Sequence, residues 1–179
     1  MRIVAYFLSI VLFLYTTFSP VLAAENSDQQ ASSSGSLNVY ELFWPVTAGK
    51  TLDDSFYFLK EFKEKIRAIF IFSATKKAEY EVALGTKRIL EAEKLLKTGK
   101  NDLADKTLDL SLVQFSEAKK NLEMAKDKKE SLKKSGTETL KKLSNLEKYL
   151  TNIIDENLAN KDKLQRVLDE VVSLKSVLQ

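Results

Sequence analysis

The sequence predicts an all-α protein, built as an antiparallel helical bundle or a coiled-coil hairpin of long helices. The first reason is that helix-breaking residues are scarce: Pro20 and Pro45 are the only prolines, and only Gly85, Gly99 and Gly136 follow Lys50 among the glycines. The second is that apolar residues recur at alternating steps of three and four, the spacing of one helix face. No alternation of period two, which would indicate strands, competes with this pattern.

Residues 1–24 read as an export signal. A positive charge at Arg2 precedes the apolar run IVAYFLSIVLFLYTTF, and small residues predict cleavage after Ala23 or Ala24. The alternative is an uncleaved membrane anchor, but the run of 16 residues is shorter than the ~20 that cross a bilayer comfortably. We therefore expect a protein exported across the cytoplasmic membrane, either secreted or held in the cell envelope.

Residues 25–50 read as a flexible polar linker. The segment begins ENSDQQASSSGS, which offers too few apolar side chains to offset the entropy lost on folding. We expect a helical domain at residues 51–134 and a C-terminal coiled-coil helix at residues 135–179.

The chain contains no cysteine and no histidine. Disulfides, thiol nucleophiles, histidine bases and the common zinc and copper sites are therefore excluded. Carboxylate pairs such as Glu91 and Glu93 occur, but residues two apart on a helix point to different faces, and a solvated surface explains them. We expect no enzyme activity, no cofactor and no metal site.

The first helix is predicted from Asp54 to about Phe72 and has an aromatic face. Thr51 and Asp54 have capping-box spacing, and Asp53 or Asp54 are alternative caps. We expect an apolar stripe of this helix to pack against the second helix. The stripe consists of Leu59, Phe62, Ile66 and Ile69, widened by Phe58 and Phe70.

A second helix is predicted from about Thr75 to Gly99. Its seam consists of Ala78, Val82, Gly85, Ile89, Ala92 and Leu96. Glycine costs roughly 1 kcal/mol relative to alanine inside a helix, so Gly85 indicates a close contact. The aromatic face of the first helix is the neighbour we expect there.

Gly99 predicts the end of the second helix, and Asn101 or Asp102 is the expected cap of the third. The third helix would bury Ala104, Leu108, Leu112, Phe115, Ala118, Leu122, Ala125 and Leu132. Further on, Ser135 and Glu138 have capping-box spacing around Gly136. This marks either a tight turn or a minor irregularity in one long helix.

The C-terminal segment has the clearest heptad pattern. Its seam consists of Leu143, Leu146, Leu150, Ile153, Asn157, Asn160, Leu164, Val167, Val171, Leu174 and Leu178. The two asparagines either fix the register or mark a local break. A straight helix from Glu138 to Leu178 would be ~60 Å long. Such a helix needs a partner, either the third helix folded back or another chain. The predicted partner seam consists of Leu164, Val167, Val171, Leu174 and Leu178.

Lysines are enriched from Glu117 to Lys142, with nine lysines against five acidic residues. A solvated helix face explains this pattern, and weak attraction to an anionic surface such as lipid head groups is the alternative. Nucleic acid is not expected as a partner, because export removes the chain from the cytoplasm and this region has no stacking aromatics.

Three stretches carry a resemblance to a known family: DDSFYFLKEFKEKIRAIFIF, KKAEYEVALGTKRILEAEKLL and KTGKNDLADKTLD. From residue 51 to about 115 the chain resembles the bacterial family called domain of unknown function 5667. Members usually have proline before the aspartate and after the serine, whereas this chain has Asp53 before Asp54 and Phe56 after Ser55. Where members commonly have a DPEKKAE-like cap, this chain has SATKKAE.

The resemblance implies an extracytoplasmic or membrane-attached helical domain and supplies no catalytic residues. It marks a structural motif in which a capped helix fixes its aromatics on the second helix: Asp54, Ser55, Phe56, Tyr57, Phe58, Leu59 and Lys60. We therefore expect a non-catalytic protein-interaction or structural module of the cell envelope, acting through a protein partner or self-association of its coiled coil. The alternative is a chaperone-like protein or a binder of anionic lipid or wall polymer.

Overall fold

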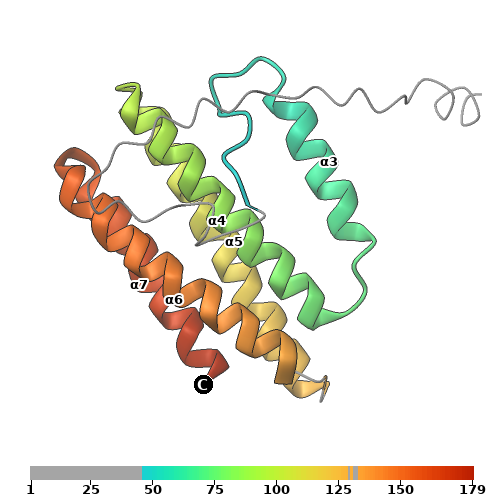
Figure 1. Ribbon diagram of the computed structural model, residues 1–179. Helices are drawn as coiled ribbons and strands as arrows, with labels where there is room; N and C mark the ends of the chain where they lie inside the picture. The colour runs from blue at the N-terminus through green and yellow to red at the C-terminus, as the bar shows by residue number, and fades with distance from the viewer. Residues whose placement is uncertain (1–45, 129, 131–132) are drawn as a thin grey trace, which may run out of the picture. The chain divides into compact units, whose positions relative to one another are not determined.

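The computed structural model describes residues 46–128, 130 and 133–179, and every regular element in that part of the chain is helical (Figure 1). The predicted all-α class is confirmed. The predicted signal at residues 1–24, and the predicted linker up to residue 45, lie outside the described residues. None of the helices described combines the length and the apolarity that a membrane span requires.

Two helical hairpins form the bundle. Helices α4 (Ala74–Lys97) and α5 (Asn101–Asp127) make the first, and helices α6 (Lys133–Glu156) and α7 (Lys161–Leu178) make the second, joined by the 3-10 turn η1 (Leu158–Asn160). Figure 1 shows each helix running opposite to the one before it. Helix α5 contacts α7, and α4 contacts α6. The predicted antiparallel bundle is therefore confirmed.

The apolar core is shared by these four helices, so residues before and after the predicted boundary at residues 134 and 135 contribute to one core. Most of the predicted seams of the second and third helices are buried, with Leu96 and Leu112 half-buried. The largest fully buried apolar side chains are Phe115, Ile89, Leu95, Leu108, Leu143, Leu146, Leu150, Leu164 and Leu174.

Helix α4 ends as the sequence predicts. Gly99 has a φ of 71°, a conformation that costs little without a Cβ. Its N–H donates to the Leu96 carbonyl and the next N–H, from Lys100, donates to the Leu95 carbonyl, both at 2.9 Å, which is the Schellman pattern. The predicted cap of the next helix is wrong: Lys100 occupies the N-cap of α5, without a side-chain hydrogen bond, and Asn101 begins the helix.

Gly85 is in close contact with an aromatic ring, but not with the predicted one. A Cβ at Gly85 would lie 2.7 Å from Cε1 of Phe115, a fully buried residue of α5. The glycine thus allows α4 and α5 to approach each other, whereas the prediction assigned this contact to the first helix. The neighbour was predicted wrongly because the sequence shows only that the helix has small side chains around Gly85. It does not show which other helix packs there.

The C-terminal segment is broken at the two asparagines. The Asn157 amide donates to the Ile153 carbonyl (2.9 Å) at the end of α6, and the Asn160 amide donates to Asp105 of α5 (2.7 Å). These side chains hold the chain reversal, so the single helix predicted over residues 135–179 is wrong and the local break is confirmed. Because α7 folds back, the predicted partner seam is in the core: Leu164, Val167, Val171 and Leu174 are buried and Leu178 is half-buried.

Gly136 lies inside a helix, because α6 begins at Lys133. Ser135 is therefore no cap; its hydroxyl donates to Glu79 of α4. Helix α5 ends at Asp127, and Leu132, predicted as part of its seam, lies outside the described residues.

Glu130, after the end of α5, caps the start of α4. Its carboxylate accepts from the backbone N–H groups of Thr75 (3.0 Å) and Ala74 (3.2 Å) and from the hydroxyls of Thr75 and Ser73. The hydrogen bonds from Thr75 and Ser73 lower the pKa of Glu130 to about 2. The side chain thus joins the end of one helix to the positive end of another.

Because the folded-state pKa is lowered, the stabilisation from Glu130 should be present above the carboxyl's ordinary pKa of 4.5 and lost as the pH falls toward 2. We expect Glu130→Gln to lower the melting temperature at pH 7, and the difference from the parent to vanish near pH 2. Thermal unfolding followed by circular dichroism at both pH values measures this. Glu123→Gln, at an exposed residue of α5, is the matched control, and a pH-independent deficit for Glu130→Gln would contradict the cap.

Candidate interaction surface

Helix α3 (Tyr57–Ile69) lies beside α4 and runs in the opposite direction (Figure 1). The prediction that its apolar stripe packs on the second helix is wrong. Eight large apolar side chains of α3 and its flanks are between 40% and 89% exposed: Phe56, Phe58, Leu59, Phe62, Ile66, Ile69, Phe70 and Phe72. We call these eight residues the α3 apolar face.

The structural motif predicted around the helix start is only partly correct. Tyr57 is buried, but Phe58 and Leu59 are exposed. The helix begins at Tyr57, later than predicted, with Phe56 at the N-cap and no side-chain cap. Asp54 instead accepts a hydrogen bond from the Phe56 N–H (2.8 Å), a local turn that holds the chain outside the helix.

Ser55 is exposed within this turn. Lys60, like Tyr57, faces the bundle. The motif therefore orients the start of α3 through Tyr57 and Lys60 and leaves its phenylalanines outward.

A cluster of charged side chains, which we call the ionic cluster, attaches α3 to α4. Lys60 pairs with Glu91, and Arg88 pairs with Glu91 (3.0 Å) and with Glu64; Lys87 also pairs with Glu64 (2.9 Å). The Glu91 side chain is fully buried and the Arg88 side chain is 5% exposed. The cluster thus joins two carboxylates of different helices through one guanidinium.

For Arg88 and Glu64, the neighbouring charges of the cluster outweigh the cost of burial. Burial lowers the pKa of Arg88, but the charges of Glu91 and Glu64 outweigh it and raise the pKa. Burial raises the pKa of Glu64, but the hydrogen bond from Lys87 and the charge of Arg88 lower it. For Lys60 burial prevails, and its pKa is lowered despite the ion pair.

Tyr57 packs against the same cations. The Lys60 ammonium lies 4.4 Å from the centroid of its ring and the Arg88 guanidinium 5.5 Å, both within range of a cation–π interaction. Burial raises the pKa of the Tyr57 hydroxyl. The contacts that hold α3 are therefore polar and aromatic, and its residues are missing from the main apolar core.

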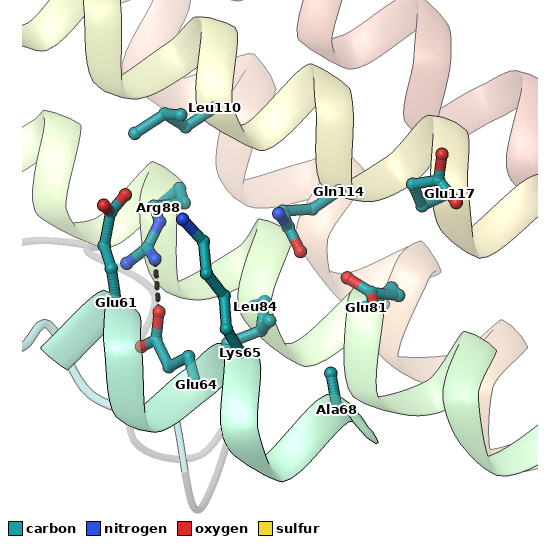
Figure 2. Close-up of a pocket in the computed structure, with 10 residues that line it drawn as sticks. All are labelled: Glu61, Glu64, Lys65, Ala68, Glu81, Leu84, Arg88, Leu110, Gln114 and Glu117. Atoms are coloured by element: carbon teal, nitrogen blue, oxygen red, sulfur yellow. Dashed lines mark hydrogen bonds and ion pairs between the residues drawn. The ribbon is translucent and has the colours of Figure 1, made fainter. Parts of the chain in front are cut away.

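A cavity of about 160 Å³ lies between α3, α4 and α5 (Figure 2). Four carboxylates line it, those of Glu61, Glu64, Glu81 and Glu117. Burial raises the pKa of Glu81, with the negative charge of Glu117 adding to the effect. The carboxylates do not converge: across the described residues, no three acidic side chains are grouped closely enough to hold a metal ion.

The charges of α3 divide between its two sides. Glu61 and Glu64 are half-buried and line the cavity toward the bundle (Figure 2). The exposed charged residues of α3 are Lys63, Lys65 and Arg67, all basic, and Lys65 also lines the cavity (Figure 2). Arg67 lies over the ring of Tyr80, 5.4 Å from its centroid. The α3 apolar face is thus bordered by positive charge.

The ionic cluster was missed because charged residues on a helix usually face solvent. Glu91 was interpreted as a solvated carboxylate, yet it is fully buried. The spacing of the neighbouring apolar residues held the information: Leu84, Arg88, Glu91 and Leu95 follow steps of four, three and four. Two charges within an apolar stripe indicate a buried pair.

Some lysines of the lysine-rich region form hydrogen bonds within the bundle. Lys119 donates to the Ser173 hydroxyl (3.0 Å), and Lys126 donates to the Val177 carbonyl. These two lysines connect α5 to α7.

The family model described as Domain of unknown function (DUF5667) matches residues 49–173, well beyond the stretch that carries the visible resemblance. No curated protein and no solved structure matches the chain.

Proposed function

The chain belongs to the family described as domain of unknown function 5667, and we propose that it is an exported, non-catalytic binding module of the cell envelope whose binding surface is the α3 apolar face. One observation carries the proposal. Eight large apolar side chains on α3 and its flanks are exposed together, and surface patches of this kind in a soluble protein commonly mark an interaction site.

The ionic cluster supports a binding role, because it determines which side of α3 faces outward. Lys60 and Glu64 attach the polar side of the helix to Glu91, Arg88 and Lys87 of α4. An amphipathic helix would normally bury its apolar side. Here the charged contacts and the buried Tyr57 hold the opposite orientation, which leaves the apolar side available to a partner.

The bundle also supports a binding role, because it provides a scaffold for α3. Its core is continuous through α4 to α7, and the C-terminal seam that the sequence offered for partner binding is used within the chain. The export proposed from residues 1–24 would bring this scaffold to the cell envelope. Binding is therefore assigned to α3 and not to the C-terminal helix.

A photocrosslinking residue in place of Phe62, in the full chain and in living cells, tests this proposal. We expect light-dependent adducts with an envelope component from position 62, which is 62% exposed on the α3 apolar face. The same residue in place of Asn152, on the exposed side of α6, should give none. Adduct formation from position 62 should also be lost on adding Ile66→Glu.

Helical content measured by circular dichroism shows whether the variants fold. Folded protein that gives no adduct from position 62, or equal adducts from both positions, would reject the α3 apolar face as the binding surface. Adducts that persist with Ile66→Glu would reject apolar contact as the basis of binding.

A further inference from the structure

Resting on the proposed function, we infer that the partner of the α3 apolar face is the anionic surface of a lipid bilayer, with α3 lying in the plane of the membrane interface. Helices that bind in this way have one broad apolar side, basic residues on the polar side and a strong separation between the two. Helix α3 has each of these features, as the exposure and the charge of its residues show.

The apolar side is broad. At 3.6 residues per turn, the exposed apolar residues from Phe58 to Phe70 cover an arc of about 120°. A coiled-coil seam is narrower than this, and a helix that inserts into a protein groove needs only a few anchors on one line. Phe56 and Phe72 extend the apolar surface beyond both ends of the helix, so the whole length of α3 offers aromatic rings to an apolar layer.

The exposed charges of α3 next to the apolar arc have one sign. At the same helical spacing, Lys65 lies on one edge of the apolar arc and Lys63 on the other, while Glu61 and Arg67 each lie about 60° beyond an edge. Lys63, Lys65 and Arg67 are exposed, and Lys65 also lines the cavity, where Glu61 and Glu64 are half-buried (Figure 2). Lysine and arginine stems lie along apolar surface while their charged ends reach lipid phosphates. A bilayer with anionic head groups therefore satisfies both edges and the apolar arc together.

Lys76 extends the same positive border past the end of α3. It is exposed and lines a depression with Arg67, Phe70, Phe72 and the carboxylate of Glu79. The two phenylalanines suit an acyl chain, and the two cations outnumber the one carboxylate, which favours a phosphate beside it. The loop that leads into α4 thus continues the surface.

A second copy of the chain fits this surface poorly. Two-fold packing of one α3 apolar face on another brings the same patch of each copy together. The borders of both copies are basic, so the edges would repel each other, and the acidic residues that would compensate are turned toward the bundle. The charge pattern therefore favours an anionic partner over self-association.

The absence of cysteine allows a position-specific test in the full chain, because an introduced thiol is the only one present. Ile66→Cys, labelled with an environment-sensitive fluorophore, reports on the surroundings of the α3 apolar face, and a control position elsewhere on the bundle separates this contact from vesicle binding through residues 1–45. Val172→Cys, an exposed apolar position of α7 that is 45% exposed against 40% for Ile66, is the matched control. Both proteins are mixed with vesicles of phosphatidylglycerol and phosphatidylcholine or of phosphatidylcholine alone.

We expect the label at position 66 to shift to the blue with anionic vesicles and the label at position 172 to remain unchanged. Half-saturation should need about tenfold less anionic lipid than neutral lipid, and the difference should shrink in high salt, because exposed charges are screened within ~8 Å at physiological ionic strength. Lys63→Gln/Lys65→Gln/Arg67→Gln should remove the preference for anionic lipid without loss of helical content.

The failure of this inference is distinguishable from the failure of the proposed function. An unshifted label at position 66, together with adducts from position 62 to a protein of the envelope, would overturn the lipid surface and keep the binding role. Adducts of the chain with itself would overturn it in favour of a second copy. An unshifted label without any adduct would overturn both proposals, and equal shifts at positions 66 and 172 would overturn the orientation of α3.

Discussion

Arg88→Met is expected to lower the free energy of unfolding by about 3–5 kcal/mol, the usual cost of removing one member of a buried ion pair. Arg88 is the only bridge between the carboxylates of Glu64 and Glu91 among the contacts of the ionic cluster. Without it, Lys60 is the one charged partner that the fully buried Glu91 keeps among the residues that the structure describes. Urea unfolding of the purified protein, followed by circular dichroism, measures the change.

Two comparisons separate the buried cluster from ordinary surface charge. Lys97→Met breaks an ion pair with Glu93 whose lysine is 68% exposed, so we expect a loss below about 1 kcal/mol. Arg88→Met/Glu91→Met removes both opposite charges and should recover part of the stability lost in the single variant. If Arg88→Met and Lys97→Met cost the same, the ionic cluster contributes no more than a surface pair.

The second large effect concerns the aromatic ring at the centre of the first hairpin. Phe115→Ala is expected to lower the free energy of unfolding by about 3–5 kcal/mol, because Phe115 is fully buried and its ring fills the space left by Gly85 of α4. The same urea measurement applies. Phe58→Ala, at a ring that is 62% exposed, is the control and should cost less than about 0.5 kcal/mol.

Gly85→Ala tests the same contact from the other side. Helix propensity favours alanine by about 1 kcal/mol, but a Cβ 2.7 Å from the ring overpacks the core at a cost of about 1–3 kcal/mol. We expect a net loss of stability, and Phe115→Leu should be less harmful when combined with Gly85→Ala than in the parent. Stabilisation by Gly85→Ala alone would contradict the tight packing.

The helices of the first hairpin were predictable because local pattern and tertiary contact agree there. The seam from Ala78 to Ala92 is buried as its spacing predicts, and Gly99 ends the helix with the backbone conformation that glycine favours. The sequence did not determine which helix packs against Gly85. The ring against Gly85 comes from Phe115, which lies on the helix connected by the shorter loop.

The orientation of α3 was not predictable from its amphipathic pattern. Periodicity shows that Phe58 and Phe62 share one side of the helix, and burial is the usual fate of such a side. The side that faces the bundle is decided by Arg88 and Glu91, which lie on a different helix and attract Lys60 and Glu64. The candidate surface could therefore be found only once these distant charges were placed together.

The break before α7 was undecided for a different reason. The heptad spacing continues through Asn157 and Asn160, so periodicity alone is satisfied by one long helix. One of the contacts that hold the bend is the hydrogen bond between Asn160 and Asp105, residues 55 positions apart in the chain. A contact of that separation leaves no mark on the local pattern.

The order of the helices also bears on how fast the chain folds. The most extensive contacts join α4 to α5 and α6 to α7, each pair being consecutive in the chain and joined by a short connection. Little loop-closure entropy opposes the formation of either hairpin, and chains dominated by such local contacts fold on the order of microseconds to milliseconds. Each hairpin then needs only to dock on the other, so the folding rate is set by helix formation and docking and not by a search for distant segments.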